Sequence, residues 1–368
     1  MYRECIFLHH LILHYPPVPN HQSRVFVQNL IRINHRRNAM NRLLSAVLAL
    51  GLGFTLATSH AADVTFKLGH GVFETHPYHD AAVRFKEAVE KASKGSIKIQ
   101  IYPARQLGDV KELMEGVQLG TVDMTMNPTS AMATSVPAMD AFQLPGVIKD
   151  YRHFVKMAKS PQARIILDTL KPKGIIALGL YDGGQRHFLS TKKLVTKMED
   201  FKGLKTRVAP ARLFLDTWKA IGTNPTPMAY GEIYSALETG TLDAVEINLT
   251  SIESEKMYEV AKNVTLTGHY FFPAALYMNK AKFDALTPEQ QQIMRTAAND
   301  IIEPQVMAID ALDKKLVTAF KAKGLKVVEA DAKLEQGIKA AVKPVVDSYK
   351  EKDPYVAAFI KAAEESAK

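Results

Sequence analysis

Residues 64–102 read VTFKLGHGVFETHPYHDAAVRFKEAVEKASKGSIKIQIY, and they set the fold class of the chain. Apolar and polar residues alternate in 64–70 and again in 96–102, which predicts a strand at each end of the stretch. Between the two strands, apolar residues recur at helical spacing over 78–93, and a proline suited to a first helical turn precedes them. This strand–helix–strand order favours a parallel sheet with a crossover helix.

The same kind of pattern continues to the end of the chain. A helix at 109–120 and a strand at 122–126 extend the first unit to βαβαβ, and a helix across 151–170 then leads to an apolar strand at 174–180. The remaining expected elements are strands at 204–208, 243–248, 264–267, 275–278 and 325–329, helices at 212–221 and 230–238, and two last helices.

The longest predicted helix runs from residue 288 to about 323, with a kink expected at Pro304 because proline interrupts helical hydrogen bonding. A helix of this length can cross two domains instead of packing within one. We therefore predict an α/β fold of two domains, with a ligand cleft between them and a long helix that spans both. The predicted domains are residues 62–183 with about 272–312, and residues 184–271 with about 313–368.

The N-terminal region carries an export signal. Met40 opens a cationic start, followed by an apolar stretch that is too short to span a bilayer as a helix and by a small-residue exit at Ala61-Ala62. We interpret 40–61 as a signal peptide and 1–39 as a mis-called upstream extension. The alternative is an unusually long leader. The mature protein is expected to be soluble and periplasmic.

Composition excludes several other classes of protein. Of the 368 residues, 47% are hydrophobic and 23% charged, which is typical of a folded protein. The formal net charge is +9; residues 1–61 hold six Lys or Arg against one Glu, so the mature chain has 9 − 5 = +4. That excess is too small to indicate nucleic-acid binding. The one cysteine, Cys5, precedes the mature chain, so neither a disulfide nor a thiolate nucleophile is expected.

Enzyme and metal motifs are absent from the sequence. There is no G-x-S-x-G, G-x-x-x-x-G-K-[ST], H-E-x-x-H, or G-x-G-x-x-G after a strand. Asp182-Gly183-Gly184 indicates only a turn. His76 and His79 are separated by a proline that disfavours the helical spacing of zinc sites, so no metal and no cofactor are predicted.

Two arginines are the strongest binding candidates. Arg186 follows the predicted turn at 182–184, and Arg207 lies near the end of the predicted strand at 204–208, which directly precedes Ala209-Pro210. A guanidinium in such a place is costly unless its planar fork meets an anion, and a carboxylate fits it with two parallel hydrogen bonds. A structural ion pair with a nearby Asp or Glu remains the alternative for each.

Five ordered motifs resemble those of the DctP-type extracytoplasmic solute-binding proteins of TRAP (tripartite ATP-independent periplasmic) transporters. The similarity covers nearly all of the mature chain. The motifs are YPARQLG at 102–108, GTVDM at 120–124, FKGLKTRV at 201–208, GTNPTPM at 222–228 and LETGTLD at 237–243.

The resemblance implies a two-domain periplasmic-binding-protein fold that closes on a ligand and delivers it to a membrane permease driven by an ion gradient. It implies that Arg207 grips a substrate carboxylate, that Arg186 reaches the ligand region, and that Tyr230 supplies an aromatic contact. No catalysis and no nucleic-acid partner are implied, and a monomer is expected. The full set of candidate ligand-binding residues is Arg207, Arg186, Tyr230, His76, Phe73, Thr129, Ile247, Glu246 and Tyr270.

Departures from the family pattern indicate the ligand class. Pro128 and Ala131 stand where sialic-acid binders of the family carry Glu and Arg, and Ile247 stands at the usual asparagine contact. Fewer polar side chains would leave the hydroxyls of a sugar acid unpaired. The expected ligand is a small monocarboxylate, whether an aliphatic, keto, hydroxy or aromatic acid, and a dicarboxylate stays open because two arginines are present.

Two other functions stay open at this point. An exported lyase or hydrolase could use His76 and Glu246, although no coherent acid–base set accompanies them. A ligand-sensing partner of a signalling receptor could use the same fold.

Overall fold

The computed structural model describes residues 63–367, so the predicted upstream extension (1–39) and signal peptide (40–61) lie outside the described residues. Within 63–367, ten strands join in one sheet of order β2-β1-β3-β9-β4-β7-β5-β6, with β8 beside β4 and β10 beside β8. The strands are β1 (Val64–Gly69), β2 (Ile97–Tyr102), β3 (Met124–Pro128), β4 (Ile175–Ser190), β5 (Lys205–Val208), β6 (Asn224–Pro227), β7 (Ala244–Asn248), β8 (Asn263–Leu266), β9 (Phe271–Asn279) and β10 (Lys326–Glu329).

The sheet has two halves that share β4. Residues 175–185 of β4 pair with β9, and residues 186–190 pair with β7 and β8. We call β2, β1, β3, β9 and β4 up to Gln185 the first half-sheet, and β4 from Arg186 with the remaining strands the second half-sheet. In the first half-sheet β1 is parallel to both β2 and β3, which confirms the predicted crossover arrangement.

β4 differs from the prediction. The strand expected at 174–180 does not end at a turn at 182–184 but runs on to Ser190, with a register shift against β9 between Asp182 and Gln185. Gly184 within this bulge has a φ of 107°, a conformation that glycine adopts without a steric penalty. A bulge bends and twists a strand. The bulge lies where β4 passes from the first half-sheet to the second.

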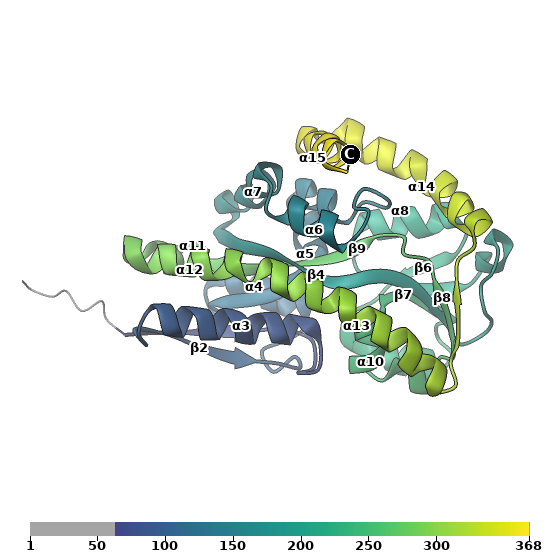
Figure 1. The fold of residues 1–368 in the computed structure, drawn as a ribbon, viewed down its shortest axis with the longest axis horizontal. Coiled ribbons are helices and arrows are strands. Elements are labelled where there is room, and N and C mark those ends of the chain that lie inside the picture. Colours follow the sequence, from purple (N-terminus) through teal and green to yellow (C-terminus); the bar gives the residue numbers. More distant parts are fainter. Residues whose placement is uncertain (1–62, 368) are drawn as a thin grey trace, which may run out of the picture. The chain divides into compact units, whose positions relative to one another are not determined.

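Helices surround the sheet in both halves (Figure 1). They are α3 (Pro77–Ala92), α4 (Val110–Leu119), α5 (Ser130–Ala133), α6 (Tyr151–Ala158), α7 (Pro161–Asp168), α8 (Arg212–Ile221), α9 (Ile233–Glu238), α10 (Leu249–Ser254), α11 (Lys280–Asp284), α12 (Pro288–Asp300), α13 (Ile302–Ala322), α14 (Ala332–Lys352) and α15 (Pro354–Ser366). Short 3₁₀ turns at Pro137–Gln143, Lys171–Lys173, Met198–Phe201, Tyr230–Glu232 and Met257–Glu259 complete the described elements.

Two helices predicted as continuous are interrupted. The helix expected across 151–170 is divided into α6 and α7, because Ser160 caps the second helix and Pro161 begins it. The long helix is divided into α12 and α13 at Ile301. The ring of a proline clashes with the carbonyl four residues earlier, and for Pro304 that carbonyl belongs to residue 300. The interruption therefore falls before the proline itself.

α13 is the long helix shared by both halves. It packs against β4 and α6, and also against α10 and β10, which belongs to the second half-sheet. Figure 1 shows it crossing in front of the sheet. The last two helices follow β10 in the chain. α14 packs against α8, and α15 packs against α6 and α7.

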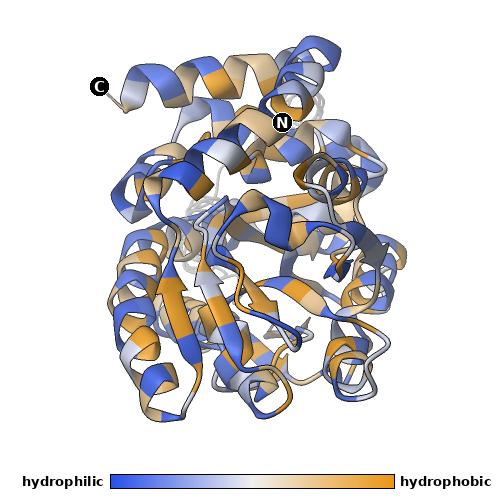
Figure 2. Ribbon diagram, turned by 90° about the vertical axis from the view of Figure 1, so that its right-hand side faces the viewer, coloured by the Kyte–Doolittle hydropathy of each residue, from blue (hydrophilic) through white to orange (hydrophobic). Residues whose placement is uncertain are grey.

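The strands form the centre of the hydrophobic core. Figure 2 shows hydrophobic residues gathered along the strands, with hydrophilic residues on the helices around them. Leu68 of β1, Phe85 of α3 and Trp218 of α8 are each fully buried. The core thus fixes both half-sheets against their helices and leaves the strand ends to form a site.

Candidate functional site

A cavity of about 520 Å³ is lined from both half-sheets. Its walls include residues that follow the carboxyl ends of β1 and β3 in the first half-sheet and of β5, β6 and β7 in the second. α4 and Phe272 of β9 complete the lining. In open α/β sheets ligands bind beyond the carboxyl ends of the strands, so this cavity is the candidate ligand site.

Arg207 reaches the cavity from the end of β5. The side chain is buried, and its Nε and Nη2 donate to the carbonyl oxygen of Met228 at 3.0 and 2.8 Å. Among residues 63–367, no partner accepts from its Nη1, and no carboxylate forms an ion pair with it. Burial lowers the pKa of Arg207 to about 10, so the guanidinium is still charged at neutral pH. The lining therefore holds a cation without an anionic partner.

Arg186 also borders the cavity, but each of its three nitrogens already donates to an acceptor of the protein. Nε donates to Glu246 Oε2 at 2.7 Å, Nη1 donates to Asn248 Oδ1 at 3.2 Å, and Nη2 donates to the Glu246 carbonyl. The guanidinium also lies 4.1 Å from the ring centre of Phe272. Arg186 and Glu246 are fully buried as an ion pair, so Arg186 is held inside the protein by its own partners.

Glu246 is the counterion of Arg186, and it lies outside the cavity lining. Tyr270 donates its hydroxyl to Glu246 Oε2 at 2.7 Å, and His269 Nε2 lies 3.8 Å from the same oxygen. Burial alone would raise the pKa of Glu246, but the charge and the hydrogen bond of Arg186, together with the neighbouring ring of His269, lower it to about 2. The carboxylate is therefore ionised, with Oε2 bonded to Arg186 and Tyr270 and with no hydrogen-bond partner for Oε1 among residues 63–367. Tyr270 lies outside the lining with it.

His76 connects the two half-sheets from the cavity wall. It precedes α3, and its Nδ1 accepts from the backbone N–H of Tyr78, which leaves the ring proton on Nε2. Nε2 lies 3.2 Å from Ser251 Oγ, and Ser251 in turn donates to Asn248 Oδ1. Burial lowers the pKa of His76 to about 3, so the ring is neutral. The histidine is part of a hydrogen-bonded chain that ends at Arg186.

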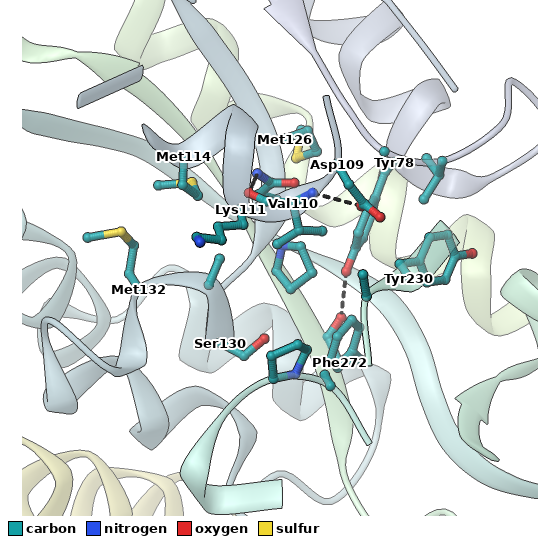
Figure 3. Close-up of a pocket in the computed structure, with 18 of the residues that line it drawn as sticks. Tyr78, Asp109, Val110, Lys111, Met114, Met126, Ser130, Met132, Tyr230 and Phe272 are labelled. Atoms are coloured by element: carbon teal, nitrogen blue, oxygen red, sulfur yellow. Dashed lines mark hydrogen bonds between the residues drawn. The ribbon is translucent and has the colours of Figure 1, made fainter. Parts of the chain in front are cut away.

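The other candidates lie in different places. Tyr230 lines the cavity (Figure 3). Phe73 is 41% exposed, with its ring centre 5.0 Å from the guanidinium of Arg105. Thr129 is fully buried and donates to Gln143 Oε1 at 3.4 Å, and Ile247 is buried in a hydrophobic cluster of the second half-sheet. The structure thus brings His76, Arg186, Arg207 and Tyr230 to the cavity, and the remaining candidates lie outside its lining.

Several lining residues were not identified from the sequence. Asn248 is the last residue of the buried strand β7 and Ser251 lies in α10, which follows it, and this position at a strand end could have indicated them. Met114, Met126 and Met132 also line the cavity, but methionines at such positions are ordinarily part of a core, and the sequence gives no signal that separates the two uses.

Two contacts join the halves beside the cavity. Arg105, in the loop before α4, forms a two-pronged ion pair with Glu255 after α10, with both N–O distances at 3.3 Å. Asp109 Oδ2 accepts from the backbone N–H of Gly231 at 3.0 Å. These contacts hold the first half-sheet's loops against elements of the second.

Residues 63–367 lack the features of a metal site and of a membrane-spanning helix. No group of three or more His, Cys, Asp or Glu residues in this range could hold a metal ion. None of its helices combines the length and the apolar character that crossing a membrane requires.

Comparison with known proteins gives a consistent picture. The sequence profile of the bacterial extracellular solute-binding proteins of family 7, DctP, matches residues 68–353. The 2,3-diketo-L-gulonate-binding periplasmic protein of Escherichia coli is 30% identical over 77% of this chain and 86% of its own length.

Solved structures agree with the sequence matches. A TRAP periplasmic solute-binding protein from Bradyrhizobium, in complex with galacturonate, aligns with a TM-score of 0.78 at 32% identity, over 82% of this chain and 99% of its own. A TRAP periplasmic solute-binding protein from Bordetella, with density assigned to pantoate, aligns with a TM-score of 0.76 at 29% identity, over 81% and 98% of the two chains. Both neighbours hold a carboxylic acid.

Proposed function

Because the chain belongs to family 7 of the bacterial extracellular solute-binding proteins, the DctP family, we propose that it captures the anion of an organic acid and delivers it to the membrane subunits of a TRAP transporter. The family assignment supplies the transport role, and the cavity supplies the chemistry. Relatives that bind 2,3-diketo-L-gulonate, galacturonate and pantoate support an acid ligand.

The observation that carries this proposal is the unpaired guanidinium of Arg207 in the cavity wall. Its Nη1 has no acceptor within the described residues, and no carboxylate there forms an ion pair with it, since Glu246, the nearby acid, is bonded to Arg186. A ligand carboxylate would compensate that charge and accept hydrogen bonds that the protein leaves unmade. A neutral ligand would not compensate the buried charge, so the free-energy cost of burying it would remain.

Arg186 argues for one carboxylate over two. Its charge is already balanced by Glu246, and its Nε, Nη1 and Nη2 each have a protein acceptor. A second ligand carboxylate near Arg186 would meet the negative charge of Glu246 as well as the positive charge of the arginine. A monocarboxylate is therefore the better match, and a dicarboxylate is the alternative that requires Arg186 to exchange partners.

Closure of two lobes on the ligand is part of the proposal. We assign 62–183 with about 272–312 to one lobe and 184–271 with about 313–368 to the other, linked through β4, the segment before β9 and α13. His76 reaches across to Ser251, and Arg105 reaches across to Glu255, so contacts between the lobes surround the cavity. A ligand that adds contacts from both sides shifts the balance towards the closed form.

The cellular setting follows from the family and the leader. Homologues named as periplasmic binding proteins support a periplasmic location for this chain after removal of residues 40–61. The permease is the expected protein partner, and the binding protein is proposed to act as a monomer.

An exported lyase or hydrolase is the weaker alternative. The two groups that it would use are committed elsewhere: His76 is neutral and bonded to Ser251, and Glu246 is ionised and paired with Arg186. A ligand-sensing role with a signalling receptor differs from transport only in the partner. A pull-down with the ligand-bound protein distinguishes these two roles, because it captures the permease in one case and a receptor in the other.

A thermal-shift screen of residues 62–368 against carboxylic acids and their neutral amides tests the proposal. A ligand present at 100 times its dissociation constant adds about 2.7 kcal/mol to the free energy of unfolding, which is measurable. We expect at least one acid to stabilise the protein and its amide to fail. The proposal would be overturned if an amide stabilised the protein as strongly as its acid, or if no acid stabilised it.

A further inference from the structure

Three methionines form one wall of the cavity. They are Met114 of α4, Met126 of β3 and Met132 of α5. All three are buried, and Figure 3 shows them on one side of the site. We call these three residues the methionine wall. Methionine is flexible and polarisable, so it packs against apolar bodies of varied shape. Facing parts of the lining, such as Phe272 and Pro210, are apolar too.

The polar side chains of the lining are mostly bonded to one another. His76, Ser251, Asn248 and Arg186 form the chain of hydrogen bonds described above. Asn248 also donates to the carbonyl oxygen of Gly183. These groups would have to break existing bonds before they could serve a ligand.

Similar commitments hold on the first half-sheet's side. Tyr78 donates its hydroxyl to the Phe272 carbonyl at 3.0 Å, and Asp109 accepts from the backbone N–H groups of Val110 and Gly231. Both residues border the cavity without offering it an unused hydrogen-bonding atom.

Beside the methionine wall, three lining atoms have no hydrogen-bond partner among residues 63–367. They are Arg207 Nη1, the Oδ1 of Asn127, whose Nδ2 donates to the Val110 carbonyl at 3.1 Å, and the Oγ of Ser130. Other polar side chains of the lining are Lys111 and Gln118 of α4, Thr134 after α5, and Tyr230. Arg207 can hold a carboxylate, while the body of the ligand meets the apolar side chains.

We propose that the cavity selects monocarboxylates with a mainly apolar, branched or aromatic body, and that the methionine wall determines this selectivity. The inference rests on the proposed function and specifies its ligand. A polyhydroxylated acid would leave several hydroxyls against thioether and methyl groups, and each unpaired hydroxyl costs about five- to 150-fold in affinity.

Titration calorimetry of residues 62–368 with pantoate, 4-methyl-2-oxopentanoate, phenylpyruvate and D-galactonate tests this selectivity. We expect at least one of the first three to bind tenfold or more tightly than galactonate. Tighter binding of galactonate would overturn the inference and leave the proposed function intact. If none of a broad set of acids bound, the proposed function would fall as well, so the two failures are distinguishable.

Two substitutions locate the selectivity. Met126→Gln keeps the side-chain length and adds an amide, and we expect it to weaken binding of the preferred apolar acid about tenfold without weakening galactonate. Ala131→Ser adds one hydroxyl to the lining with little risk to folding, and it should narrow the gap to galactonate severalfold. Met307→Gln, on α13 outside the lining, is the matched control and should change neither affinity. Equal losses for both ligands in the two lining variants would contradict a role in selectivity.

A second inference concerns Arg105, which does not line the cavity. Its guanidinium bonds to both carboxylate oxygens of Glu255 and to the Gly71 carbonyl at 2.7 Å. It also lies 5.0 Å from the ring centre of Phe73 and 5.8 Å from that of Tyr230. One side chain therefore contacts loops of both half-sheets.

The local backbone fixes Arg105 in that place. Arg105 has a φ of 65° in the left-handed region, which residues other than glycine rarely adopt. A Cβ on Gly231 would lie 3.2 Å from the Arg105 side chain, so that glycine permits the close approach. We propose that Arg105 and Glu255 form a latch that stabilises the closed form of the cleft, independently of the ligand that the cleft selects.

Distances between two spin labels test the latch without any ligand. The mature chain has no cysteine, so Leu119→Cys on α4 and Lys219→Cys on α8 give one label on each side. We expect Arg105→Gln to lower the ratio of closed to open molecules about fivefold in pulsed electron paramagnetic resonance. Glu255→Gln should do the same. Arg84→Gln, which removes an exposed ion pair within α3, should have no effect. Unchanged distance distributions in both latch variants would overturn the proposal.

Discussion

Two buried arginines border the same cavity, and their surroundings differ. Arg186 is bonded to a carboxylate and an amide oxygen and lies over an aromatic ring, whereas the carbonyl of Met228 is the one hydrogen-bond acceptor that residues 63–367 give Arg207. Arg186 therefore maintains the structure of the site, whereas Arg207 is available to bind a ligand. A buried guanidinium thus indicates a ligand only when the protein leaves its charge uncompensated.

Replacing Arg186 tests the structural half of this comparison and carries the largest expected effect. Arg186→Leu leaves Glu246 ionised, buried and without its counterion. Breaking a buried pair in this way lowers the free energy of unfolding by about 3–5 kcal/mol. Urea unfolding of the ligand-free protein measures the change.

Arg207→Leu is the matched control for that experiment. It removes a buried charge that has no ionic partner among the described residues, so stability should stay the same or rise. Equal destabilisation by the two substitutions would show that the distinction between the arginines is wrong.

Replacing Arg207 tests the binding half. Arg207→Ala should weaken binding of the acid by about 2–5 kcal/mol, because a desolvated carboxylate loses its partner. Arg207→Lys keeps the charge but loses the planar fork, and its loss should be intermediate. Titration calorimetry gives both values, and near wild-type affinity in the alanine variant would refute the assigned role.

The sequence could identify both arginines but could not tell them apart. Arg186 follows a predicted strand and Arg207 lies near the end of another, and the local sequence allows each to be either a ligand group or half of an ion pair. The decision depends on the register of β4 against β7, which sets Arg186 opposite Asn248 and next to Glu246, 60 residues away in the chain. Long-range register of this kind leaves no local pattern, and so Glu246 and Tyr270 were assigned to the ligand instead of to Arg186.

The fold was more accessible to prediction than the site. Local alternation and helical spacing placed β1, β2 and α8 to within a residue, because these patterns reflect which faces are buried. The glycines at 183 and 184 were read as a turn because they permit one, but pairing with β9 and β7 keeps the segment in a strand. Tertiary pairing overrode the local preference there.

Glu246→Gln tests the difference between the two arginines further, because it changes only the counterion of Arg186. The amide can still accept a hydrogen bond from Arg186, but the negative charge is lost, and we expect stability to fall by about 1–3 kcal/mol. Arg207 loses a nearby negative charge as well, so an anionic ligand should bind about twofold to tenfold more tightly. In one preparation of this variant, the free energy of unfolding should fall while the affinity measured by calorimetry rises.

Acid pH gives the smallest and most specific effect. The pKa of Glu246 is lowered from 4.5 to about 2 in the folded protein, so its ionised form contributes stability above pH 4.5. That contribution is lost as pH falls from about 4.5 to about 2. The difference in unfolding free energy between wild type and Glu246→Gln should shrink over that interval, and a constant difference would contradict the ion pair.

A crystal structure of residues 62–368 with its bound acid tests the central claim most directly. The account predicts a ligand carboxylate oxygen about 2.7–2.9 Å from Arg207 Nη1, with Glu246 still bonded to Arg186. A carboxylate seated on Arg186 with Glu246 displaced, or a ligand that makes no contact with Arg207, would contradict it.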